Sequence, residues 1–226
     1  MAGLSKLRVG VLVSGFGSNL QALIDQCAQP DFPAEIVTVI SNKPGAGALD
    51  RAARAGIASR VIRHQDFPDR ASFDQALDAA LRADRVELVC LAGFMRVLTA
   101  EFVTAWQDRI LNIHPSLLPA FRGLDTHRRA LEAGVRFHGC TVHIVRPDLD
   151  DGPILVQGIV PVRPDDDEST LAARILELEH QAYPQALRLI AEGRVRIEGK
   201  RALIVGAVAP AGPSGLNPRL LPSVAG

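Results

Sequence analysis

A short apolar run that ends in a glycine-rich turn constrains the fold of this chain more than any other feature. Residues Leu7–Val13 are rich in β-branched side chains and stop at Ser14-Gly15-Phe16-Gly17-Ser18-Asn19, after which apolar residues recur at helical spacing. This pattern predicts a strand, a tight turn and a helix. It then recurs, with strands predicted at 35–40, 58–62 and 87–92 and helices at 47–55 and 72–83. Such alternation indicates a parallel, doubly wound sheet.

The second half of the chain is richer in predicted strands, at 109–113, 139–145 and 154–162, with helices at 101–106 and 126–133. An apolar stripe over 168–192 predicts a long C-terminal helix, bent or broken where Pro184 removes an amide donor, and 194–205 predicts a terminal hairpin. We therefore predict an α/β fold with a Rossmann-like, mostly parallel sheet flanked by helices. Residues 206–226 lack periodicity, which predicts a mobile tail.

Composition narrows the class of protein. The 226 residues are 47% hydrophobic, which suits one compact domain with a short appendage. Lys+Arg and Asp+Glu are both 25, so overall charge drives binding to neither nucleic acid nor membrane. Three widely spaced cysteines indicate a reducing compartment, and no apolar stretch is long enough to span a bilayer. We expect a cytoplasmic protein without nucleic-acid or membrane partners.

The turn after the first predicted strand is a candidate anion site, because the free amides of a helix N-terminus hold groups such as phosphate. Its two glycines, Gly15 and Gly17, match neither the P-loop nor the dinucleotide fingerprint. A plain strand-to-helix turn capped by Ser18 is the alternative interpretation.

A second candidate site follows the strand at 109–113. Asn112 and His114 are two residues apart, so their side chains point to one side of a strand end, where open α/β sheets bind ligands. Amide and imidazolium donors suit the oxyanion of acyl transfer. A buried, satisfied histidine is the alternative. Asp148, Asp150 and Asp151 form either a solvated turn or a carboxylate site that favours the charged form of His114.

Three further features stand out. Glu179 borders the apolar stripe of the last helix, where a carboxylate needs a partner or a ligand. The segment Gly93-Phe94-Met95-Arg96-Val97-Leu98 follows a predicted strand and either walls a pocket or is plain core. The remaining histidines lack metal-ligand spacing, so we predict no metal site, and we place His64 in a surface loop.

Taken together, SGFGSNL (14–20), SNKPGAG (41–47), LAGFMRVL (91–98), LNIHPSLLPAFRG (111–123), HGCTVHIV (138–145), LDDGP (149–153) and EHQAYP (179–184) resemble the phosphoribosylglycinamide formyltransferase family. The match runs in order from about residue 7 to 205. It implies a single formyltransferase domain at 1–205, with a nucleotide-phosphate-binding half near 1–100 and a folate and catalytic half near 101–205.

The resemblance implies that the formyl group of 10-formyltetrahydrofolate passes to 5′-phosphoribosylglycinamide in purine biosynthesis, without metal or ATP, in a monomer or a homodimer. Asn112 and His114 then stabilise the oxyanion, and Asp150 tunes His114 and assists proton transfer. The implied ribonucleotide contacts are Gly17, Ser18, Asn19 and Glu179. The implied folate contacts are Arg70, Met95, Arg96, Val97, Leu98, Asn112, Arg146, Pro147, Asp148, Leu149 and Asp150.

The sequence departs from the family pattern at Phe16, Ala120, Arg122 and Asp151, where the family often has a polar residue, Lys or Pro, and a second glycine. Because Asp151 adjoins Asp150, either carboxylate can hold the catalytic position. The alternative functions for an α/β fold of this kind fall into two classes. One is a 10-formyltetrahydrofolate hydrolase, for whose usual N-terminal regulatory domain we expect no room here, and the other is a non-catalytic nucleotide-binding module or a nicotinamide enzyme.

Overall fold

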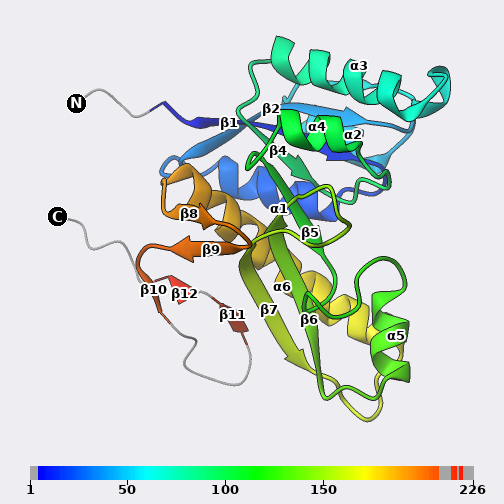
Figure 1. Ribbon diagram of the computed structural model, residues 1–226, viewed down its shortest axis with the longest axis vertical. Coiled ribbons are helices and arrows are strands. Elements are labelled where there is room, and N and C mark those ends of the chain that lie inside the picture. Colours follow the sequence, from blue (N-terminus) through cyan, green and yellow to red (C-terminus); the bar gives the residue numbers. More distant parts are fainter. Residues whose placement is uncertain (1–4, 209–214, 218, 221–226) are drawn as a thin grey trace. The chain divides into compact units, whose positions relative to one another are not determined.

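The computed structural model describes residues 5–208, 215–217 and 219–220, with the backbone alone described from Ala207 onward (Figure 1). The chain divides into two compact units. The first contains the described residues up to Asn112 together with Ile144–Asp148, and the second contains Ile113–His143 and the described residues from Leu149 onward. The division of one domain into halves near residue 100 stays a prediction.

The secondary structure follows the predicted order closely. The helices are α1 (Ser18–Cys27), α2 (Gly47–Arg54), α3 (Arg70–Ala83), α4 (Ala100–Ala105), α5 (Thr126–Glu132) and α6 (Glu168–Ala191), with a 3₁₀ turn η1 (His64–Asp66). The strands are β1 (Leu7–Val13), β2 (Ala34–Ser41), β3 (Ser59–Val61), β4 (Leu88–Leu91), β5 (Ile110–His114), β6 (Phe137–Ile144), β7 (Ile154–Pro161), β8 (Val195–Glu198), β9 (Arg201–Ile204), β10 (Ala207–Val208), β11 (Gly215–Asn217) and β12 (Arg219–Leu220).

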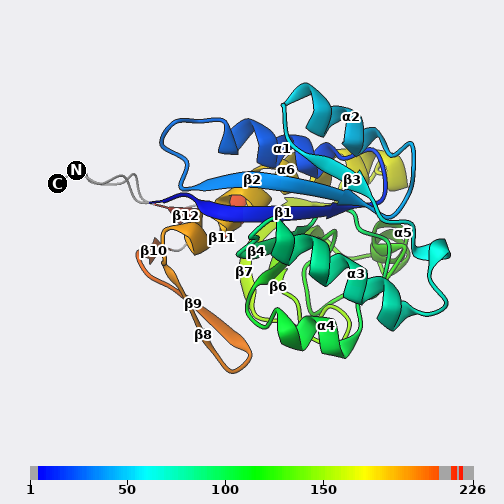
Figure 2. The same ribbon diagram turned by 90° about the horizontal axis from the view of Figure 1, so that it is seen from above.

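The first unit is built on a parallel sheet in the order β3-β2-β1-β4-β5. Central strand β1 pairs with β2 on one side and β4 on the other, so that Val11 lies opposite both Val39 and Cys90. Helices α1 and α2 cover one face of the sheet and α3 and α4 the other (Figure 2). Coverage of both faces explains why β1 is a continuous apolar run rather than an alternating one.

The core beneath α3 and α4 joins helix side chains to the sheet. Phe73 and Leu77 of α3 pack with Trp106, which is 1% exposed and donates its indole N–H to Asp78 over 2.7 Å. Helix α3 begins at Arg70 because the Asp69 carboxylate caps it by accepting the Ser72 amide over 2.7 Å. The capped, amphipathic segment therefore folds where the sequence predicts a helix.

The second unit contains an antiparallel pair, β6 and β7, against which α6 packs. Helix α6 begins at Glu168 and is capped by Asp167, whose side chain forms a reciprocal capping box with Thr170. Of the two predicted effects of Pro184, a bend or a break, the break was wrong, since α6 runs without interruption to Ala191. Pro184 and its neighbour Tyr183 are buried, and this burial offsets the single backbone hydrogen bond that proline removes. The predicted terminal hairpin is confirmed as β8 and β9.

The predicted tail, 206–226, contains regular structure where it is described. Strand β11 pairs antiparallel with β7, with Leu216 opposite Gly158, and β10 pairs with β12. These pairings were not predicted from the sequence, and the rest of the predicted mobile tail lies outside the described residues. The α/β class with a mostly parallel sheet, a long C-terminal helix and a terminal hairpin is confirmed.

Candidate active site

His114 and Asp150, two of the predicted catalytic residues, lie side by side in the second unit. His114 is the last residue of β5 and is 6% exposed. Its Nδ1 lies 3.5 Å from Oδ2 of Asp150, a carboxylate that is itself 8% exposed. The carboxylate therefore faces the imidazole across a short, largely dry gap, in which charge–charge interactions are stronger than in water. The acidic segment is not simply a solvated turn.

The backbone conformation at Asp150 and a contact with the Gly123 amide hold the Asp150 side chain beside His114. Asp150 has a φ of 50°, a left-handed conformation that is uncommon for residues other than glycine. The same Oδ2 accepts the Gly123 amide over 2.9 Å, and Oδ1 lies 3.9 Å from Nε2 of His143 on β6. His143 is 2% exposed and was missed as a site residue. Its alternation with Thr141 on a predicted strand was the available signal.

The other ring nitrogen of His114 faces the loop before α5. Nε2 lies 3.0 Å from the carbonyl oxygen of Phe121, whose φ is 53°. A carbonyl only accepts hydrogen bonds, so Nε2 donates to it. An oxygen that can accept a hydrogen bond thus faces each ring nitrogen of His114. The role of His114 as a charged donor stays a prediction.

Asp151, the departure from the family pattern, joins three segments. Its Oδ1 pairs with Arg122 and its Oδ2 lies 2.6 Å from Nζ of Lys200, at the turn between β8 and β9. Hydrogen bonds from Lys200 and Arg122 lower the pKa of the Asp151 carboxyl. These residues line a cavity of about 360 Å³ that also includes Asp150. Asp150, and not Asp151, is the carboxylate that faces His114.

Two further histidines of the second unit are held neutral by burial. His138 is 1% exposed, and His127 and Phe121 contact its ring edge-on. Desolvation, followed by repulsion from His127 and His114, lowers the pKa of His138 to about 4. Desolvation likewise lowers the pKa of His127. Burial thus disfavours the charged form of both rings.

The predicted phosphate loop lies in the first unit, between β1 and α1. Gly17 caps α1 with a φ of 81° and no side-chain hydrogen bond, so the alternative in which Ser18 is the cap was wrong. A Cβ at Gly17 would lie 2.7 Å from Cβ of Ala48, so only glycine allows α2 to approach this closely. Phe16, the other departure here, is 73% exposed, and the guanidinium of Arg51 lies 4.4 Å from its ring centroid.

The predicted folate contacts of the first unit fall into two groups. After β4, Met95 is 66% exposed and Val97 is 54% exposed, while Leu98 is buried. Met95 and Val97 are therefore not part of the core, and their role as a pocket wall stays a prediction. Arg96 belongs to the same segment, and Arg70 lies at the start of α3.

The second group follows β6. Arg146 pairs with Asp108 and is half-buried, whereas Pro147 and Asp148 are exposed. Leu149, the first residue of the second unit after this segment, is 56% exposed.

Two predicted residues lie in different units from their expected partners. Asn112 precedes His114 by two positions on β5 but belongs to the first unit. Glu179 is buried in α6 of the second unit, whereas Gly17, Ser18 and Asn19 belong to the first. Their shared roles stay predictions.

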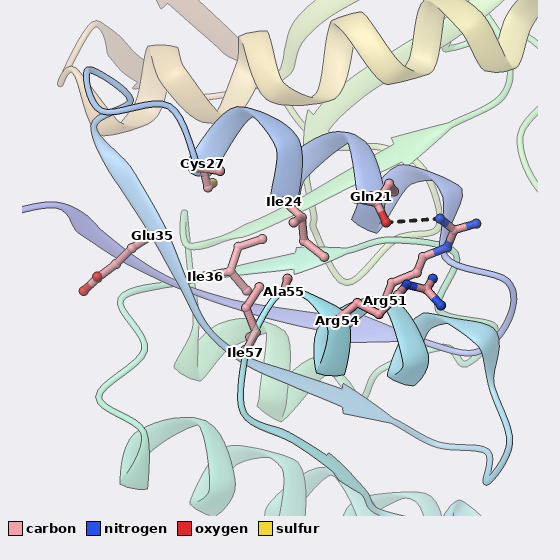
Figure 3. A pocket seen from close by; sticks show the side chains of 10 residues that line it. Gln21, Ile24, Cys27, Glu35, Ile36, Arg51, Arg54, Ala55 and Ile57 are labelled. Atoms are coloured by element: carbon pink, nitrogen blue, oxygen red, sulfur yellow. Dashed lines mark hydrogen bonds between the residues drawn. The ribbon is translucent and has the colours of Figure 1, made fainter.

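A larger cavity of about 480 Å³ lies elsewhere in the first unit, between α1, α2 and the start of β2 (Figure 3). Ile24, Ile36 and Ile57 line it, and Gln21 accepts a hydrogen bond from Arg51 over 3.1 Å at one end. It contains none of the predicted site residues. Cavity volume alone therefore does not point to the predicted catalytic residues, which lie in the second unit.

Among the residues that the structure describes, no group of three or more His, Cys, Asp or Glu side chains is arranged to hold a metal ion. No helix within the described ranges is both long and apolar enough to cross a membrane.

Comparison with known proteins defines the class. A family model described as formyl transferase matches residues 7–187, and the chain belongs to this family. The chain is 42% identical over 204 residues to a phosphoribosylglycinamide formyltransferase of Escherichia coli, covering 90% of this chain and 96% of the relative. This full-length match places the chain in the phosphoribosylglycinamide formyltransferase branch of the family.

A solved structure and a longer relative are also similar to this chain. The crystal structure of glycinamide ribonucleotide transformylase 1 from Symbiobacterium toebii superposes with a TM-score of 0.86 at 50% identity, covering 88% of this chain and 94% of that one. The trifunctional purine biosynthetic protein adenosine-3 of Gallus gallus is 51% identical over 193 residues. That match covers 85% of this chain but spans 19% of the relative's length.

Proposed function

We propose that this chain transfers the formyl group of 10-formyltetrahydrofolate to the amine of 5′-phosphoribosylglycinamide, giving tetrahydrofolate and the formylated ribonucleotide. The observation that carries the proposal is the buried pair of His114 and Asp150 in a member of the formyl transferase family. A carboxylate beside an imidazole favours the charged ring. A charged N–H donor in a dry site stabilises the negative charge that develops on a formyl oxygen.

In the proposed step, the acceptor amine forms a bond to the formyl carbon and the carbonyl oxygen becomes an oxyanion. His114 donates a hydrogen bond to this oxygen, and the Asn112 amide, two residues earlier on β5, is the second donor. The bond between the formyl carbon and N10 of the folate then breaks. N10 gains a proton, the amine nitrogen loses one, and Asp150 assists this proton movement through His114.

The Phe121 carbonyl holds the His114 N–H that the oxyanion requires. Because Nδ1 faces Asp150 and Nε2 lies 3.0 Å from this carbonyl oxygen, the formyl oxygen takes the place of the Phe121 carbonyl at Nε2. Phe121 has a left-handed backbone, which costs of order 1 kcal/mol or more for a residue with a Cβ.

The two substrates have separate sets of proposed contacts. The amides that follow Gly17 at the start of α1 hold the ribonucleotide phosphate, because helix N-termini bind anions, and Glu179 contacts the ribose side. The exposed Met95 and Val97 support a folate wall completed by Arg70, Arg96, Leu98, Asn112 and the segment Arg146–Asp150. The transfer uses protein donors throughout, so the proposal includes neither metal nor ATP.

We also propose a cytoplasmic location and a monomer or homodimer. Cys27, Cys90 and Cys140 are all free thiols in the structure, which supports a reducing compartment.

The test compares His114→Ala and Asp150→Asn with Asp165→Asn, a change at a carboxylate to which no role is assigned. Each purified variant is assayed for formyl transfer to the ribonucleotide. We expect the first two to lose at least about 100-fold in turnover, since loss of one oxyanion donor typically costs 100- to 1,000-fold. Near-full activity in either variant, with Asp165→Asn as the reference, contradicts the proposal.

A further inference from the structure

Three polar side chains at one edge of the first unit's sheet form a connected set outside the residues assigned above. Ser14 directly follows β1, Asn42 directly follows β2, and His64 begins the turn η1 after β3. These strands are parallel neighbours, so their carboxyl ends meet at the same edge. His64 is half-buried in a 3₁₀ turn, so its prediction as a surface-loop residue was wrong.

The burial of this set requires internal partners. Ser14 is 5% exposed and Asn42 is 2% exposed, and buried polar groups are costly unless hydrogen-bonded. The Ser14 Oγ lies 2.6 Å from Oδ1 of Asn42. The same Oγ lies 2.8 Å from the backbone nitrogen of Met95. At the other end, Nδ2 of Asn42 lies 3.3 Å from Nδ1 of His64.

The direction of each bond follows from the Met95 amide, which can only donate. Ser14 therefore accepts from Met95 and gives its own hydroxyl proton to Oδ1 of Asn42. This contact orients the amide, so Nδ2 faces His64 and donates to Nδ1. Nδ1 of His64 is accordingly the acceptor in this contact. The donors therefore all point the same way along the set: Met95 donates to Ser14, Ser14 donates to Asn42, and Asn42 donates to His64.

The far end of this set is the segment proposed above as a folate wall. Met95 and Val97 are exposed apolar residues without regular secondary structure, so their side-chain positions depend on where the backbone is held. One anchor is the bond from the Met95 amide to Ser14. The other is the bond from the Thr99 amide to Oδ2 of Asp74 over 2.6 Å.

We propose that Ser14, Asn42 and His64 form a hydrogen-bond relay that positions the Met95 backbone and ties the phosphate loop to the folate wall. The proposal rests on the proposed function, which supplies the roles of those two segments. Ser14 immediately precedes Gly15 of the phosphate loop, so one hydroxyl fixes the start of that loop and the middle of the wall. The three are positioning residues and contact no reacting atom.

The kinetic test removes the shared hydroxyl. Ser14→Ala leaves the Met95 amide and Asn42 unsatisfied, and we expect the KM for 10-formyltetrahydrofolate to rise about tenfold, with kcat changed less than about twofold. Ser14→Thr, which restores a hydroxyl, recovers most of the affinity. The matched control is Thr38→Val on β2, because the Thr38 side chain is fully buried and its hydroxyl has no hydrogen-bond partner among the described residues.

A second readout does not depend on catalysis. Hydrogen exchange of the Met95 amide in the full chain is expected to be at least about tenfold faster in Ser14→Ala than in wild type, and unchanged in Thr38→Val. Unchanged Met95 exchange in Ser14→Ala overturns the relay. Faster exchange with an unchanged folate KM overturns its positioning role. If wild type transfers no formyl group, the proposed function fails, and Met95 exchange alone decides whether the relay exists.

Discussion

Asp150 holds its carboxylate 3.5 Å from Nδ1 of His114 while its own backbone adopts a φ of 50°. A left-handed aspartate is unfavourable by of order 1 kcal/mol, so the surrounding contacts must hold it there. The Gly123 amide supplies one such contact, at 2.9 Å from the same oxygen. The strain therefore lies at the residue that we propose tunes His114.

Replacing Asp150 and Asp151 one at a time separates the proposed catalytic role of Asp150 from the structural role of Asp151. Asp150→Asn removes the charge that faces His114, and we expect turnover to fall at least about 100-fold. Asp151→Asn leaves that charge in place, and we expect turnover to stay within about threefold of wild type. The measurement is steady-state formyl transfer by both purified variants. A larger loss in Asp151→Asn than in Asp150→Asn would move the catalytic role to residue 151.

The ion pairs of Asp151 predict how the terminal hairpin is attached. Because Lys200 and Arg122 lower the pKa of Asp151, the attachment is complete at neutral pH and is lost only as the pH falls through that lowered value. Asp151→Asn removes it at neutral pH, so trypsin should cleave after Lys200 faster in this variant. High salt should reduce this difference in cleavage rate, because salt screens the ion pairs of Asp151 in wild type. Equal cleavage rates for wild type and Asp151→Asn at low salt would show that the hairpin is held by other contacts.

Burial of His138 predicts a loss of stability in mild acid. Its pKa is about 4 in the folded chain against about 6.5 when unfolded, so between these values the unfolded state binds a proton that the folded state does not. This contribution to stability is complete above pH 6.5 and is lost progressively as the pH falls toward 4.

His138→Phe keeps a ring in place and removes the titration. Neither ring nitrogen of His138 has a hydrogen-bond partner among the described residues, so the change breaks no bond that the structure shows. The wild-type Tm should fall by several degrees more than that of His138→Phe between pH 7 and pH 5. The same fall in both proteins would contradict the assignment.

The phosphate loop supplies a pair of glycine variants with opposite expectations. At Gly17 an added Cβ meets Ala48 at 2.7 Å and the φ is 81°, so Gly17→Ala should lower the free energy of unfolding by about 1–3 kcal/mol. At Gly15 an added Cβ meets nothing within 4 Å, so Gly15→Ala should have little effect on stability. Urea unfolding measures both. Equal stability of the two variants would mean that the loop does not require this close approach.

The sequence predicts the elements whose signals are local. Three such elements are confirmed, and each is marked by a pattern within its own segment: the apolar run of β1, the glycine of the turn at Gly17, and the apolar stripe of α6. The continuity of α6 through Pro184 is not visible in the sequence, because the burial that offsets the missing hydrogen bond comes from packing distant in sequence. The pairing of β11 with β7 has the same origin, since a short, irregular segment becomes a strand only beside its partner.

The same distinction, between local signals and contacts distant in sequence, applies to the candidate site. Residue types and their spacing predict His114 and Asp150 as candidates, but their contact joins residues far apart in the chain. The Phe121 carbonyl and the Gly123 amide were missed because backbone groups leave no trace in residue type. His143 was missed because its position beside Asp150 depends on strand pairing. Ser14 and Asn42 lie in recognised motifs, yet their bond is visible only in three dimensions.

The most direct test of the account is a formyl-transfer assay of the purified chain with 10-formyltetrahydrofolate and three acceptors: 5′-phosphoribosylglycinamide, the same riboside without its phosphate, and water. The account predicts rapid release of tetrahydrofolate with the ribonucleotide, much slower release with the riboside because the loop at Gly17 then has no phosphate to hold, and no release with water alone. Equal release of tetrahydrofolate in all three would contradict it and identify the chain as a hydrolase.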